Sequence, residues 1–106
     1  MLVSKDDSLF DKSIRMIINK SMKCLLNDED EKALYLLRKA DKWVRKRPTY
    51  NQYAIVSNLY NNMSLVLRRN NFLELAKEYL MKAKSINFRY KLDSGLTDMN
   101  YGTLAI

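Results

Sequence analysis

Histidine is missing from this sequence of 106 residues, and cysteine occurs once, at Cys24. These absences exclude an internal disulfide, a histidine-ligated metal site and catalysis by serine–histidine or cysteine–histidine pairs. Cys24 lies on an apolar stripe, and we expect it to be a small core residue, as free cysteines usually are. We therefore expect no catalytic residues, no metal and no cofactor, and we predict that the chain is not an enzyme.

Helix-breaking residues and long apolar runs are also scarce. Two glycines and one proline disfavour an all-β fold with many tight turns and favour long helices. No apolar run approaches the roughly 18 residues that a membrane span needs, and Lys5, Asp6 and Asp7 interrupt the start of the chain where a signal peptide would be apolar. Together with the single cysteine, these features predict a cytoplasmic protein, with a cytoskeletal or axonemal location included, and no contact with a membrane.

Apolar residues recur at helical spacing along most of the chain. They predict helices over 9–26, 29–46, 50–69 and 72–87, and a fifth helix that starts near Ser94. Each of the four has a polar residue near its start with an acid or amide three residues later, which predicts a side-chain cap. The predicted capping pairs are Ser8 and Asp11, Asp28 and Glu31, Thr49 and Gln52, and Asn71 and Glu74.

A set of residues returns after 43 positions. The first set is Asp28, Glu31, Ala33, Leu37 and Ala40, and its counterpart is Asn71, Glu74, Ala76, Leu80 and Ala83. A regular period of this size indicates stacked units, each too small to bury its own apolar face. The short connections predict antiparallel helix pairs, and the alanines allow the two helices of a pair to approach closely.

The segment 60–83 resembles a tetratricopeptide repeat. First-helix positions of the family pattern are matched by Tyr60, Met63, Ser64 and Leu67, and second-helix positions by Ala76, Leu80 and Ala83. The first pair fits less well, because Lys20 and Asp30 stand where apolar residues are usual. The resemblance, closest to the extended repeats of kinesin light chains, implies an all-α, right-handed solenoid of about two and a half repeats: 9–47, 49–88 and a partial 94–106.

The same resemblance implies a protein-interaction scaffold that binds a peptide or a neighbouring subunit through its first helices. One asparagine recurs at the same place of each first helix, and arginines are expected near that surface. These predicted partner-binding residues are Asn19, Asn62, Asn100, Arg15, Arg68 and Arg69. Asparagine amides match the donors and acceptors of a peptide main chain, and arginines suit an acidic ligand. Solvated asparagines and cations that stabilise a helix end are the alternative reading.

A dense basic run gives a second candidate surface, made of Arg38, Lys39, Lys42, Arg45, Lys46 and Arg47. With a net charge of +7, the run permits nucleic acid as a partner, which would bind through its phosphates. Nucleic acid is the least favoured partner, because Trp43 is the only aromatic residue inside the run and the cations also suit the helix dipole.

Two further alternatives concern the chain as a part of something larger. A structural subunit of a cytoskeletal or axonemal assembly, held by its edges, is the main alternative to a peptide-binding scaffold. The fifth predicted helix is apolar through to Ile106 and has no following helix to cover it. Self-association, or a partner contact through this uncovered carboxyl-terminal helix, is therefore expected.

Overall fold

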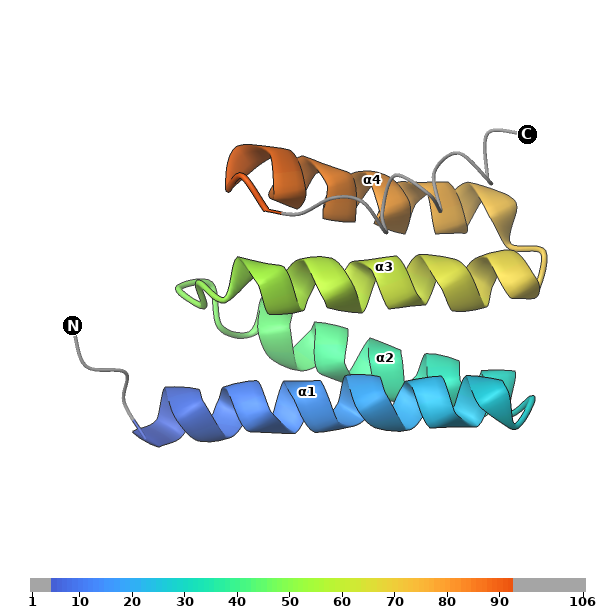
Figure 1. Ribbon diagram of the computed structural model, residues 1–106, viewed down its shortest axis with the longest axis horizontal. Helices are drawn as coiled ribbons and strands as arrows, with labels where there is room; N and C mark the ends of the chain where they lie inside the picture. The colour runs from blue at the N-terminus through green and yellow to red at the C-terminus, as the bar shows by residue number, and fades with distance from the viewer. Residues whose placement is uncertain (1–4, 93–106) are drawn as a thin grey trace.

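A computed structural model describes residues 5–92 of the chain, with side chains from Ser8 onward. This part contains four helices and no strand: α1 (Lys5–Leu26), α2 (Asp30–Arg45), α3 (Tyr53–Arg69) and α4 (Leu73–Arg89) (Figure 1). The predicted all-α class is confirmed over this range. The predicted fifth helix and the partial repeat 94–106, with Asn100, lie outside the described residues.

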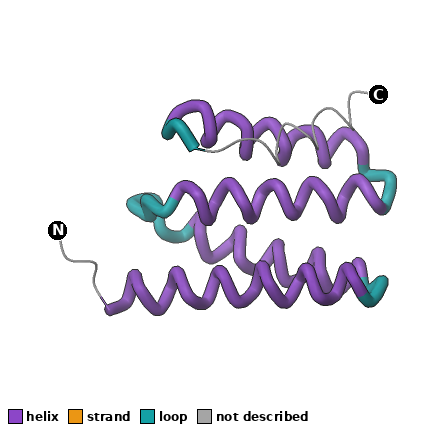
Figure 2. Tube along the Cα trace, in the orientation of Figure 1, coloured by secondary structure: helices purple, strands orange, loops and turns teal. Residues whose placement is uncertain are grey.

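The helices form two antiparallel pairs that pack side by side. α1 packs against α2 and α3 against α4, each pair closed by a short turn, and α3 also contacts both helices of the first pair. Figure 1 shows α2 behind the layer formed by α1 and α3, and Figure 2 shows how short the loops between the helices are. Among the described helices α4 packs only on α3, so one side of α4 has no helical neighbour in this part of the chain.

Small residues lie on the buried sides of α2 and α4. Ala33, Ala40, Ala76 and Ala83 are completely buried, and so are Leu37 and Leu80. A methyl side chain allows the two backbones to come close, and each buried leucine then fills the space between them at a gain of about 1.5–3 kcal/mol. Cys24 is buried and free, as its position on the stripe predicted.

The helix ends differ from the prediction at every described start. α1 begins at Lys5, so Ser8 lies inside it, and the N-caps of the other helices are Glu29, Gln52 and Phe72, none with a side-chain capping bond. The predicted capping pairs are therefore wrong. Two of the predicted cap residues, Asp28 and Asn71, instead have positive φ angles of 60° and 67° at the end of the preceding helix.

Schellman motifs end three of the helices. The N–H of Glu29 donates to Cys24 O at 2.8 Å and that of Asp28 to Leu25 O at 3.1 Å. The same pair of bonds recurs at the ends of α3 and α4, where Asn71 and Lys91 take the left-handed position. Because this motif satisfies the last free carbonyls of a helix, it competes with capping of the next helix for the same residue.

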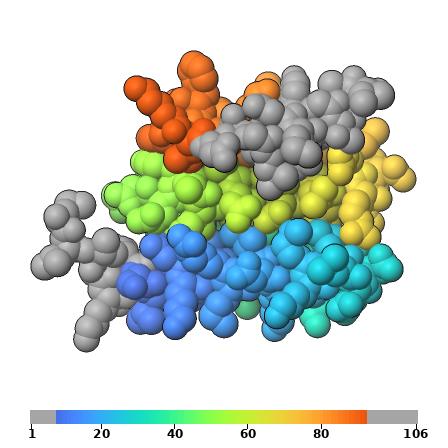
Figure 3. Space-filling model, in the orientation of Figure 1, coloured from blue at the N-terminus to red at the C-terminus, as the bar shows by residue number. Residues whose placement is uncertain are grey.

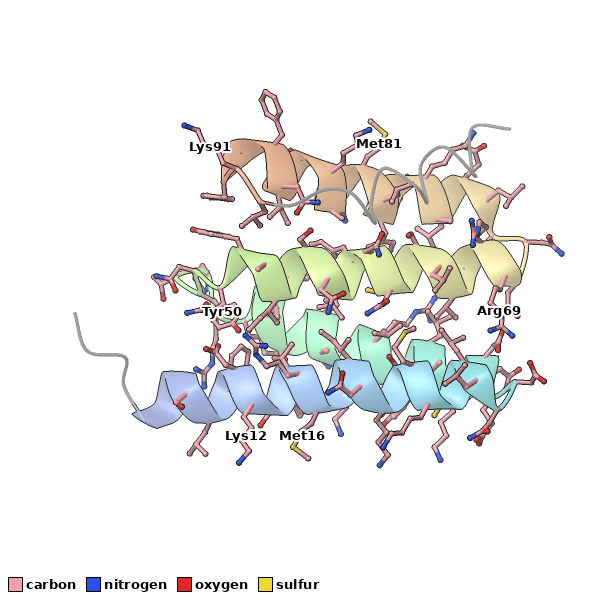
Figure 4. All side chains as sticks on the ribbon, in the orientation of Figure 1. Lys12, Met16, Tyr50, Arg69, Met81 and Lys91 are labelled. Carbon is pink, nitrogen blue, oxygen red and sulfur yellow. The ribbon has the colours of Figure 1, made fainter. Side chains whose placement is uncertain are left out.

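Polar side chains tie the two helix pairs together at both ends of the molecule. At one end the Arg69 guanidinium donates to Leu25 O and to Asp28 Oδ1, both at 3.2 Å, and Asn70 Nδ2 donates to Asp30 Oδ2 at 2.9 Å. At the other end the Tyr50 hydroxyl donates to Asp11 Oδ1 at 2.5 Å. Figure 4 shows Tyr50 and Arg69 at these opposite ends. These hydrogen bonds fix the position of α3 and of the loop before it relative to the first helix pair.

Candidate functional site

A shallow hollow lies between α1 and α3, which are the first helices of the two pairs. It has a volume of about 210 Å³ and is lined by Arg15, Ile18, Asn19, Ala54, Ile55 and Asn58. Figure 3 shows α1 and α3 side by side on this face of the molecule. The apolar residues form its floor, since Ile18 and Ile55 are buried, whereas Arg15, Asn19 and Asn58 are exposed. The hollow therefore presents two amides and one guanidinium to a ligand.

The predicted asparagine row is only partly on this surface. Asn19 is exposed and lines the hollow, but Asn62 is 6% exposed, and its Nδ2 lies 3.4 Å from Asn58 Oδ1, to which it donates. Asn58, one helical turn before Asn62, takes the exposed position. Asn58 was not among the predicted residues, although it stands 43 residues after Arg15 and so occupies the equivalent place of its repeat.

The three predicted arginines separate in space. Arg15 lines the hollow between α1 and α3. Arg69 points to the turn between α1 and α2, where its ion pairs with Asp28 and Asp30 measure 3.2 and 3.3 Å. Arg68 is half-buried at the same end of α3. As residues that bind a partner, all three stay predictions, but only Arg15 shares a surface with Asn19.

The predicted basic run covers the exposed side of the second half of α2 and the turn after it. All six of its cations are exposed. The run also contains one acid, Asp41, which is 6% exposed and is held by Arg45 through bonds of 3.1 Å to each of its oxygens. Since this ion pair is internal to α2, the run offers no free carboxylate to solvent.

Four tyrosines and three arginines surround a second hollow at the end of this run. It has a volume of about 330 Å³ and lies between the ends of α2 and α4, over the start of α3. Its lining includes Arg45, Arg47, Arg89, Tyr50, Tyr53, Tyr60 and Tyr90. These tyrosines could not be connected with the basic run from the sequence, because they come from three different segments of the chain.

Burial is the main cause of the raised pKa of two tyrosines in this hollow, Tyr60 and Tyr50. It raises the pKa of Tyr60 to about 12, and the nearby Asp41 carboxylate adds to the shift. Burial, followed by the hydrogen bond to Asp11, raises the pKa of Tyr50 above its usual range. Since ionisation would place a second negative charge beside each carboxylate, both hydroxyls remain neutral donors at physiological pH.

Comparisons with protein-family models, with curated proteins and with solved structures find no match for this chain. Over residues 5–92, no helix combines the length and the apolar character that a membrane span requires. In the same range, no cluster of three or more cysteine or carboxylate side chains is placed to hold a metal ion. The two hollows described above are the candidate sites.

Proposed function

We propose that the chain belongs to a right-handed, tetratricopeptide-like α-solenoid that acts in the cytoplasm as a non-catalytic scaffold for protein interaction. Two successive antiparallel pairs support this reading, because they carry the same residues at their helix contacts, 43 positions apart. The contact of α3 with both helices of the first pair supports it as well. Units that stack in this way expose their first helices as a shared surface.

The single observation that carries the proposal is the hollow between α1 and α3. An extended peptide has one donor and one acceptor per residue, and the amides of Asn19 and Asn58 can pair with both. Arg15 adds a charged fork that suits a carboxylate of the ligand. The expected ligand is therefore an extended peptide segment of a partner protein, with an acidic residue that reaches Arg15.

A structural subunit held by its edges is the second candidate, and the outer side of α4 favours it. Leu73, Met81 and Phe88 are 48%, 59% and 89% exposed, and their spacing places them on one side of the helix. Exposed apolar residues in such a row are typical of a protein interface. In this case the chain would be covered at α4, whereas the hollow between α1 and α3 would have no ligand.

The two candidates can be separated with peptides selected from a random display library on the wild-type chain. We expect the double substitution Arg15→Gln with Asn19→Ala to weaken the selected peptides by about tenfold or more, the equivalent of about 1.4 kcal/mol. Lys20→Gln is the matched control, since it removes one positive charge from the exposed side of α1 away from the hollow. If binding instead survives the double substitution and is lost in Phe88→Glu, the structural-subunit candidate replaces the scaffold.

A further inference from the structure

The hollow at the end of the basic run has two helices as walls and a third as its floor. α2 and α4 both pack on α3, but within the described chain they do not pack on each other, so their ends leave a gap over α3. Val56 and Tyr60 of α3 line the bottom of this gap. Its volume of about 330 Å³ is near the lower end of the range for ligand pockets, about 300–1,000 Å³.

Both walls of this hollow are basic. Arg45 and Arg47 line one wall and Arg89 lines the other. The flanking segments 42–53 and 82–92 contain no aspartate or glutamate and add Lys42, Lys46, Lys82, Lys84 and Lys91. The nearby acid, Asp41, is buried and paired with Arg45. The two basic segments are far apart in sequence and reach the same end of the molecule only through the stacking of α4 on α3. A polyanion would therefore meet cations from both sides.

Aromatic rings lie among these cations. The rings of Tyr53 and Tyr90 are parallel, with 3.6 Å between centroids, and Tyr90 is 38% exposed. Near the end of α2, Arg47 lies 4.1 Å from the centre of the Phe10 ring, and this ring contacts Tyr50 edge to face. The stacked pair provides a flat π surface beside Arg89, the arrangement on which a nucleobase stacks while its phosphate contacts a cation.

We propose that this tyrosine-lined hollow is a binding site for single-stranded nucleic acid, distinct from the peptide surface on α1 and α3. Phosphates contact the basic walls, and an unpaired base stacks on the Tyr53–Tyr90 pair. The sequence alone disfavoured such a partner, because the basic run contains only one aromatic residue. The fold supplies the missing aromatic rings from α3 and α4.

A single strand fits the site better than a duplex or an acidic peptide. Bases of a duplex are paired and stacked inside it, so they cannot reach the tyrosine pair, whereas those of a single strand can be splayed out. An acidic peptide would use the cations but would gain nothing from the stacked rings. Loss of a ring therefore distinguishes the single strand from both other ligands.

The charge contribution can be tested with a labelled oligothymidylate of about 15 nucleotides, close to the longest site size of single-strand-binding domains. We expect binding in fluorescence anisotropy titrations, with log affinity falling linearly as log salt rises. Arg89→Gln should make that slope shallower by about 0.7, as expected for one lost phosphate contact with a single strand. The matched control, Lys32→Gln, removes the same charge at the opposite end of α2 and should leave the slope unchanged. Equal effects of the two substitutions would overturn the proposal, as would absence of binding to the wild-type chain.

The stacking contribution needs a second pair of variants. Tyr90→Ala should weaken the oligothymidylate by about fivefold or more, the lower end of the range for one stacked base. Tyr90→Phe keeps the ring and should retain binding, while Tyr35→Ala removes an exposed tyrosine elsewhere on α2 and should have no effect. Polyglutamate and a duplex of equal length serve as competitors. If either competes as well as the unlabelled single strand, or if Tyr90→Ala binds normally, the site is a general anion surface and the proposal is wrong.

Discussion

The backbone of a few turn residues determines where each helix of this protein stops. Asp28, Asn71 and Lys91 all have positive φ angles, and each donates one of the two bonds of a Schellman motif. Left-handed backbone costs an ordinary L-residue about 1–2 kcal/mol, and asparagine and aspartate tolerate it better than lysine does. The turns thus use residues that resemble N-caps in sequence but act as the end of the previous helix.

Substitutions at Asn71 separate these two roles. Asn71→Gly should leave the free energy of unfolding unchanged or raise it by up to about 1 kcal/mol, because glycine takes the left-handed conformation without strain. Asn71→Ala should lower it by about 1 kcal/mol, because alanine keeps the Cβ that disfavours left-handed backbone but loses the short polar side chain that lets asparagine tolerate it. Urea denaturation measures both values. A glycine variant less stable than the wild type would indicate that Asn71 acts as an N-cap instead.

α2 and α4 each bury one side and keep the opposite side in solvent, whereas α3 packs against three helices and is buried around most of its surface. On α2 the buried side includes Ala33, Leu37 and Ala40, and on α4 it includes Ala76 and Leu80, with an exposed fraction of zero for all five. The closely packed alanines leave no room for larger side chains, so a bulky residue at Ala76 would overpack the contact with α3. Both larger and smaller side chains at these contacts should therefore lower the stability of the fold.

Truncation of the central leucines should destabilise the chain strongly. Leu37→Ala and Leu80→Ala should each lower the free energy of unfolding by about 2–5 kcal/mol, because each leaves a cavity in a buried contact. Lys42→Ala, on the exposed side of α2, should change it by no more than about 0.5 kcal/mol. Guanidinium denaturation followed by circular dichroism measures all three. Equal effects at the three positions would contradict the assignment of the buried sides.

At the scale of the molecule, the described residues include an acidic cluster at one end and a basic cluster at the other. Asp28 and Glu29 in the turn after α1, with Asp30 and Glu31 at the start of α2, form the acidic cluster, whereas the ends of α2 and α4 carry the cations of the tyrosine-lined hollow. Arg69 neutralises part of the acidic end and joins it to the end of α3. Asp30 Oδ1 is buried without a directed hydrogen bond, so its attraction to Arg69 at 3.3 Å is mainly Coulombic.

Loss of Arg69 should weaken the connection between the two helix pairs. Arg69→Met keeps the aliphatic stem and should cost about 1–2 kcal/mol in free energy of unfolding, because Leu25 O and the Asp30 carboxylate lose a charged partner. Arg68→Met is the matched control and should cost less than about 0.5 kcal/mol. A double-mutant cycle with Asp30→Asn isolates the ion pair. A coupling energy of zero would mean that the Arg69–Asp30 ion pair does not contribute to the connection.

The helices and their buried sides were largely predictable from the sequence. Helical periodicity depends on neighbours three and four residues away. The stripe that contains Ala33, Leu37 and Ala40 can therefore be recognised from the sequence without any tertiary contact. The repeat of that stripe after 43 residues predicted two similar pairs. Helix ends were less predictable, because Asp28 and Asn71 can either cap the following helix or end the preceding one, and the Schellman bonds decide which.

The candidate sites depended on tertiary structure, because their members are distant in sequence. The first hollow joins Asn19 with Asn58, 39 positions later, and the second joins Tyr53 with Tyr90, 37 positions later. Helical register grouped Asn19 with Asn62, but only the structure shows that Asn19 is exposed and Asn62 is buried. In the same way the basic run was visible in the sequence, whereas its aromatic surroundings formed only when α3 and α4 brought Tyr53 and Tyr90 beside it. Local patterns determine which side of a helix is apolar, and only the packing of the helices decides which polar residues meet.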